Sequence, residues 1–202
     1  MIPSLNNRRT QVVLTSALVI AAGLIGLASV LPPGSAAPPN PRKWDWIEGT
    51  TWYVKPQGLP AMIYDAQADH AVPFSDQTVY TIQSCHWGYF VGSTTLQYGD
   101  MPIQCRKLIG SVTPEGTISL TFIEPNAEPS GAPSVTRGTG VMRRVQGAWT
   151  MENQMCTQME DDPNVFVQHW AYMFQVAPGD AAWNNVPGVD MSVPDFMAEC
   201  SE

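Results

Sequence analysis

The sequence has few charged residues, and basic residues are the scarcest of these. Charged side chains make up 14% of the 202 residues, against roughly 25% in an average soluble domain. Lys and Arg number 10 against 18 Asp and Glu, which gives a formal net charge of −8. A nucleic-acid-binding surface needs clustered basic residues to displace phosphate counterions. The composition therefore disfavours a nucleic-acid partner.

The motifs of several common enzyme classes are also missing. The sequence contains no nucleophile elbow, no metal-binding helix, no phosphate-binding loop and no dinucleotide fingerprint, so hydrolase, kinase and dehydrogenase activities are disfavoured. No two of its four cysteines have the Cys-x-x-Cys spacing of zinc and redox sites. We therefore expect no cofactor and no metal.

Acidic residues are absent before Asp45, where the sequence instead carries an apolar run. Arg8 and Arg9 precede Val12–Leu31, in which only one Thr and two Ser are polar. A basic start, an apolar run and small residues after it are typical of an export signal, but the run is also long enough to cross a bilayer as a helix. Residues 1–37 are predicted to be a cleaved signal peptide or a single retained transmembrane anchor. Either way, the rest of the chain is expected to be extracytoplasmic, whether periplasmic, secreted or anchored.

Proline marks the boundary that follows. Residues 38–43 are predicted to form a stiff linker, because proline fixes φ and lacks an N–H donor. Residues 1–37 contain two Arg and no acid, so the remainder carries 8 basic and 18 acidic residues and a formal charge of −10. Such a surface disfavours binding to anionic lipid. We expect membrane contact only through the N-terminal segment, if it is not cleaved.

Residues 44–178 alternate between apolar and polar with a period of two. In the segment 117–122, Ile118, Leu120 and Phe122 share one face, which predicts a half-buried strand. A Pro-x-Gly turn joins it to the strand 105–112, and Gln146-Gly147 joins 140–145 to 148–156 as a second hairpin. Further strands are expected at 49–55, 77–84, 89–97 and 165–176.

Seven or eight strands connected as sequential hairpins predict an all-β fold, an up-and-down antiparallel barrel of about eight strands. The interior of such a barrel either is filled by side chains or holds one small ligand. Residues 179–202 are rich in Pro, Gly and Asn, which predicts a loop-like tail with a short helix capped by Ser192. We expect the tail to pack on the barrel through Trp183 and Phe196.

The segment Trp44–Val54, WDWIEGTTWYV, resembles the opening strand of lipocalin and avidin-like barrels. In those families a Gly closely followed by a Trp starts the barrel, and the Trp plugs its base. Two residues separate Gly49 from Trp52 here, where those families place one, so the Trp is expected on the other strand face relative to the Gly. The resemblance implies a calycin-like barrel that binds a small apolar ligand. The alternative is that Trp44, Trp46 and Trp52 are ordinary core or rim aromatics.

Four cysteines in an exported chain allow up to two disulfides with three connectivities. They are Cys85, Cys105, Cys156 and Cys200. We favour Cys85 with Cys105, which ties neighbouring strands, and Cys156 with Cys200, which staples the tail to the barrel. The alternative is that some remain free as small buried side chains.

His169 stands in the middle of an otherwise apolar strand and is the candidate catalytic residue. The preceding strand supplies Glu152 and Gln154, and its antiparallel pairing is expected to bring positions near 153 and 154 opposite 168 and 169. A histidine with such a partner inside a barrel acts as an acid/base on a small hydrophobic substrate, as in an isomerase or cyclase. The alternative is a buried neutral histidine that hydrogen-bonds a neighbour.

Aromatic and methionine side chains provide the candidate ligand-binding residues, because flexible thioethers line adaptable apolar pockets. They are Trp52, Trp149, Met151, Met155, Trp170 and Tyr172. The alternative for the methionines is gap-filling in a core. The favoured function is therefore binding of a small, mainly apolar ligand. An enzyme on the same scaffold comes second, and a ligand-free module of the cell envelope comes third.

Overall fold

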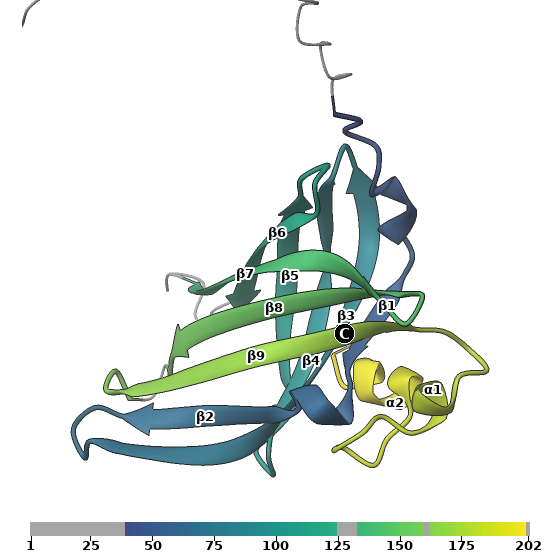
Figure 1. Ribbon diagram of the computed structural model, residues 1–202. Helices are drawn as coiled ribbons and strands as arrows, with labels where there is room; N and C mark the ends of the chain where they lie inside the picture. Colours follow the sequence, from purple (N-terminus) through teal and green to yellow (C-terminus); the bar gives the residue numbers. More distant parts are fainter. Residues whose placement is uncertain (1–38, 125–132, 160–161, 201–202) are drawn as a thin grey trace, which may run out of the picture. The chain divides into compact units, whose positions relative to one another are not determined.

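The computed structural model describes residues 39–124, 133–159 and 162–200, which form a β-structure with short helical segments (Figure 1). The strands are β1 (Thr51–Val54), β2 (Pro60–Asp65), β3 (His70–His86), β4 (Tyr89–Tyr98), β5 (Gln104–Val112), β6 (Thr117–Glu124), β7 (Ser134–Val145), β8 (Ala148–Gln158) and β9 (Val165–Val176). The helical segments are η1 (Asp45–Ile47), η2 (Pro56–Gly58), α1 (Ala181–Asn184) and α2 (Val193–Ala198). None of the described helices has the length and apolar character needed to cross a membrane. The predicted signal or anchor lies outside the described residues.

The strands close into an antiparallel barrel of eight positions. From β3 to β9 each strand pairs with the next one in sequence, and β1 and β2 both pair with β3 on one side and β9 on the other. Since they occupy successive lengths of the same gap, β1 and β2 are two halves of one strand, interrupted by η2. The predicted all-β, up-and-down barrel of about eight strands is confirmed.

The interruption between β1 and β2 is sealed by polar groups of β3. The Gln77 amide accepts from the backbone N–H of Val54 at 3.1 Å and donates to its carbonyl at 3.0 Å, while the Asp76 N–H donates to Leu59 O at 2.8 Å. A Cβ at Gly58 would lie 2.9 Å from the Tyr172 nitrogen, so only glycine fits. The sequence patterns missed β2 and the first part of β3, because Pro60 and Pro73 read as strand breakers.

The core fills one end of the barrel, which we call the near end; it carries the β3–β4, β5–β6 and β7–β8 turns. Trp44 and Ile47 are buried across this end and close it, and the Trp44 indole N–H donates to Thr113 O at 2.7 Å. Trp52 is fully buried inside the barrel, where its indole N–H donates to Thr50 Oγ1 at 2.7 Å. The extra residue after Gly49 is accommodated because this glycine precedes β1, in a turn with φ of 73°.

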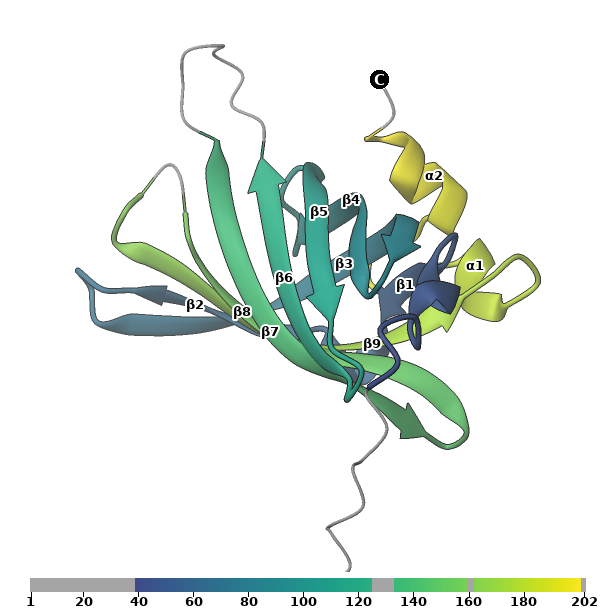
Figure 2. The ribbon, with the colours of Figure 1, turned by 90° about the horizontal axis from the view of Figure 1, so that it is seen from above.

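The C-terminal tail covers the outer wall of the barrel. Figure 2 shows α1 and α2 on one side of the barrel, beside β1 and β3. Phe196 is buried in a cluster with Tyr53 and Phe174 from the outer faces of β1 and β9, and Trp183 packs against it partly exposed. The Asp195 N–H donates to Ser192 Oγ at 3.1 Å, so Ser192 caps α2.

A disulfide between Cys105 and Cys200 pins the end of the tail to β5, and the favoured pairings Cys85–Cys105 and Cys156–Cys200 are wrong. Cys85 belongs to the core cluster inside the barrel, whereas Cys105 is on the outer face of β5, so the two cannot meet. Cys85 and the exposed Cys156 are free thiols. Burial, helped by the charge of Asp45, raises the pKa of Cys85 to about 11, so this thiol keeps its proton. The disulfide indicates an oxidising, extracytoplasmic environment.

Candidate binding site inside the barrel

A buried ion pair joins β9 to β3 inside the barrel. His169 Nδ1 lies 2.7 Å from Asp76 Oδ2, with the two side chains 0% and 1% exposed. The ring N–H is not well aligned with that oxygen, so the contact is chiefly electrostatic. His169 Nε2 lies 2.7 Å from Gly58 O, and Thr78 donates to Asp76 Oδ1 at 2.9 Å. Because both ring nitrogens face acceptors, this geometry favours the protonated, imidazolium form of the ring.

Two opposing effects set the pKa of His169. Burial lowers it, but the close contact with the Asp76 carboxylate and the Gly58 carbonyl outweighs burial and raises the pKa above its ordinary 6.5. Both nitrogens are engaged, so no ring atom is left to move a proton on a substrate. The pair instead holds η2, the interruption in the first strand, against β9 and β3.

The predicted catalytic partners of His169 do not approach it. Met155 is the residue opposite His169, and Gln154 pairs with Trp170. Glu152 and Gln154 point to the outer face, where Glu152 binds Arg143 at 3.1 Å. The register lies about two residues from the expected one, because the loop length does not fix the pairing.

Asp76 is the partner that sequence reasoning missed. The predicted strand began at residue 77, one position after Asp76, so it left this residue out. Asp76 extends the inward alternation of Thr78, Tyr80 and Ile82, and this alternation is the signal that would have found it. An acid at an inward strand position opposite a mid-strand histidine is the pattern to look for.

A second, partly buried ion pair lies on β5 and β6. Arg106 is held by Glu124 at 3.1 Å, Gln104 at 3.1 Å and the Thr136 hydroxyl at 3.2 Å. Thr136 in turn bonds Thr157 across β7 and β8 at 2.6 Å. Each of the two cations, His169 and Arg106, therefore has a carboxylate partner, and these four charges cancel.

Between these pairs and the apolar core, several buried polar groups have no hydrogen-bond partner among the described residues. They are the Tyr80 and Thr94 hydroxyls, both atoms of the Asn153 amide and Arg106 Nε. Tyr80 and Thr94 are cross-strand neighbours, whereas Asn153 is on β8, four positions from β4 in the ring of eight and thus on the opposite wall. Burial raises the pKa of Tyr80 well above its ordinary value, so its hydroxyl remains a donor.

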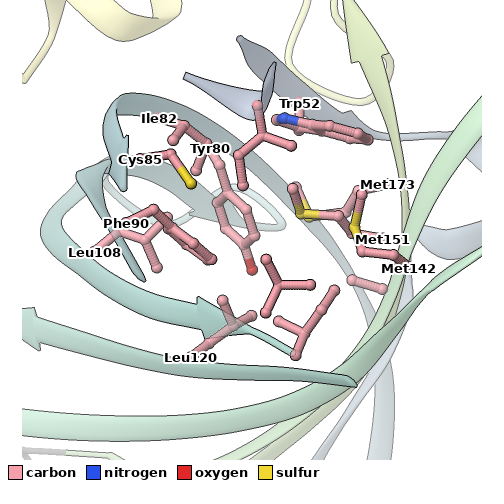
Figure 3. Close-up of a cluster of buried hydrophobic side chains, with 14 of the residues drawn as sticks. Trp52, Tyr80, Ile82, Cys85, Phe90, Leu108, Leu120, Met142, Met151 and Met173 are labelled. Carbon is pink, nitrogen blue, oxygen red and sulfur yellow. The ribbon is translucent and has the colours of Figure 1, made fainter. Parts of the chain in front are cut away.

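Side chains that are small or flexible surround these polar groups. Asn153 pairs with Gly140 and Ala171 and lies between Met151 and Met155 along β8. Figure 3 shows the Tyr80 ring in the middle of the buried cluster, with Met142, Met151 and Met173 along one side. Methionine has three rotatable bonds and repacks more easily than other apolar residues.

The predicted ligand-binding residues divide between the two faces of the wall. Trp52, Met151 and Met155 face the interior. Trp170 and Tyr172 do not. Side chains alternate along a strand and His169 points inward, so the residues one and three positions after it point outward. Trp170 is 50% exposed and stacks on Tyr172 with the ring centroids 5.6 Å apart.

Trp149 takes a third position, partly buried at the near end. Its ring packs edge-on against Trp44 at 4.9 Å. It also lines a surface pocket of about 360 Å³ beside the β7–β8 turn, together with Phe174, Val176 and Asp180. This pocket lies outside the barrel wall and is separate from the interior polar groups.

The described part of the chain holds no group of three or more His, Cys, Asp or Glu placed to bind a metal ion. No family model matches the chain, and neither the curated proteins nor the solved structures contain a match.

Proposed function

We propose that the barrel binds one small, mainly apolar and uncharged molecule in its interior. The observation that supports this is the set of unpartnered polar side chains, Tyr80, Thr94 and Asn153, within a methionine-lined wall. Each buried polar group without a partner costs about 1–3 kcal/mol, and native proteins keep few of them. A ligand hydroxyl, carbonyl or amide would satisfy these groups, while its apolar part packs against Met151 and Met155.

The charges inside the barrel favour an uncharged ligand. Asp76 is paired with His169 and Glu124 with Arg106, so the described part of the barrel interior offers no unpaired charge to neutralise an ionised ligand. A charged ligand would bring a buried charge without a counterion, which is strongly unfavourable. Asn153 offers two donors and an acceptor, which suits a neutral group that both gives and takes hydrogen bonds.

The far end of the barrel, which carries the β2–β3, β4–β5 and β8–β9 connections, is the expected entrance. Ile63, Phe74 and Met159 are only partly buried there, around Leu96 and Tyr98. The near end is closed instead by fully buried aromatic residues. An apolar ligand entering at the far end would meet apolar side chains first and the polar groups afterwards.

A fluorescence titration of the full chain with N-phenyl-1-naphthylamine, a neutral apolar probe, tests the proposal. We expect one site per chain, and Asn153→Leu should weaken the affinity at least about tenfold, the effect of losing ~1.4 kcal/mol of binding free energy. Gln154→Leu, one residue away on the outer face, is the matched control and should bind as the parent does. Equal affinity of the two variants would refute the proposed site, and no binding by the parent would favour a ligand-free envelope module.

The alternative function, an isomerase or cyclase with His169 as acid/base, has less support. The two ring nitrogens of His169 are already engaged by Asp76 and Gly58. Glu152 and Gln154 lie on the other face of the sheet. Replacing His169 by Gln is expected to change stability rather than any turnover.

A further inference from the structure

Exposed apolar side chains gather at the near end of the barrel and on the adjoining outer face of β4 and β5. Trp87 is 56% exposed and Tyr89 is 72% exposed, although both are large aromatics. Val91 and Ile109 continue the patch as exposed cross-strand neighbours. We call Trp87, Tyr89, Val91 and Ile109 the aromatic patch. Trp46 adds a separate, partly exposed ring at the same end, beside Trp44 and Trp149. An exposed apolar patch of this kind marks an interaction surface.

The backbone at Trp87 shows that its exposure has a conformational cost. Trp87 and Gly88 form the two-residue turn between β3 and β4 with φ of 53° and 77°. Such a turn favours Asn-Gly, and a bulky residue at positive φ is uncommon. The stability of the turn alone therefore does not explain a half-exposed tryptophan at this position.

The N-terminal chain approaches the barrel beside this patch. The Lys43 ammonium donates to Pro114 O in the β5–β6 turn at 2.6 Å, and Pro41 O would lie 3.8 Å from a Cβ at Gly88. The apolar run ends at Leu31. The seven residues 32–38 that precede the described part span at most about 25 Å when fully extended.

Charge is distributed unequally between the two ends of the barrel. The β2–β3, β4–β5 and β8–β9 connections at the far end carry Asp65, Asp69, Asp100 and Asp162, and their described residues include no Lys or Arg. At the near end, positive and negative side chains are nearly balanced. Arg42, Lys43, Arg143 and Arg144 are accompanied there by Asp45, Glu48, Glu115, Glu152 and Asp180. Repulsion from anionic headgroups is therefore weakest at the near end.

From these observations we infer that the near end rests on a lipid bilayer, with Trp46, Trp87 and Tyr89 in the interfacial region, which differs from the expectation of membrane contact only through the N-terminal segment. Amphipathic aromatic rings prefer the headgroup level of a membrane. The near-neutral charge of this end permits that contact. The acidic far end, the expected entrance for a ligand, then faces away from the membrane.

Quenching of tryptophan fluorescence by brominated lipid tests this inference. The first tryptophan of the chain is Trp44, so any quenching reports on the barrel and not on the apolar run. The full chain is reconstituted into phosphatidylcholine vesicles with bromine on the acyl chains near the headgroups. We expect quenching of part of the emission, and Trp87→Phe should remove about half of the quenched fraction, since Trp46 and Trp87 are the two interfacial indoles.

Trp170→Phe is the matched control, because Trp170 is equally exposed but is on the outer face of β9. It should leave the quenched fraction unchanged. Equal losses in the two variants, or no quenching in the parent, would overturn the inference. A Trp87→Phe variant that dissociates a dimer without changing the quenching would assign the aromatic patch to a second copy of the chain and would equally overturn it.

Discussion

Asn153 is the residue at which stability and binding are expected to oppose each other. Its amide is buried with neither atom bonded, so replacing it by the similarly sized Leu removes an unsatisfied group without leaving a cavity. Asn153→Leu should raise the free energy of unfolding by about 1–3 kcal/mol, measured by urea denaturation. Gln154→Leu should leave it nearly unchanged. A destabilised Asn153→Leu variant would show that the amide is satisfied in solution.

His169 predicts how stability depends on pH. Its pKa is raised in the folded state above its ordinary 6.5, so the stabilisation is fully present below pH 6.5 and is lost as the pH rises through the raised pKa. The free energy of unfolding of the parent should therefore fall over that window. His169→Gln, which does not titrate, should lack this fall. An equal fall in the variant would place the titrating group elsewhere.

Among the elements, the tail depends on its covalent link to β5. The Cys105–Cys200 disulfide closes a sequence separation of 95 residues, and a loop of that size restricts the unfolded chain strongly. Cys200→Ser should lower the free energy of unfolding by about 2–5 kcal/mol, while Cys156→Ser, at an exposed free thiol, should not. A Cys85–Cys105 peptide recovered by mass mapping of the unreduced parent would contradict the link.

The β3–β4 turn predicts a gain in stability from a substitution. Asn tolerates the positive φ of Trp87 better than Trp does, so Trp87→Asn should raise the free energy of unfolding by about 1 kcal/mol. Thermal unfolding of the variant beside the parent measures this. A lowered melting temperature would mean that the indole stabilises the turn.

Strand elements were predictable from sequence wherever alternation was uninterrupted, as at 165–176, whose bounds match β9. They were not predictable at β2. The backbone groups of Val54, at the break before η2, are hydrogen-bonded by Gln77 from another strand, and a local sequence pattern does not contain such a long-range contact. The disulfide was missed for a related reason. Which face Cys85 and Cys105 occupy depends on strand register, which only the closed barrel fixes.

The whole molecule combines a closed near end, a polar layer in the middle of the barrel and an acidic far end. Under the proposed function, the unpartnered groups Tyr80, Thr94 and Asn153 would hydrogen-bond a neutral ligand, and the flexible methionines would pack around it. The candidate site was foreseen only in part, since Met151 and Met155 were expected from composition. The polar layer was not, because it arises from residues on β3, β4 and β8 that only closure brings to face each other.

A crystal structure of the full chain with N-phenyl-1-naphthylamine bound would show where the probe lies and so decide whether the barrel interior is the binding site. We expect one probe molecule inside the barrel, with its amine within hydrogen-bond distance of Asn153 or Tyr80 and its rings against Met151 and Met155. A probe found only in the surface pocket between Trp149 and Phe174, with the interior unchanged, would contradict it.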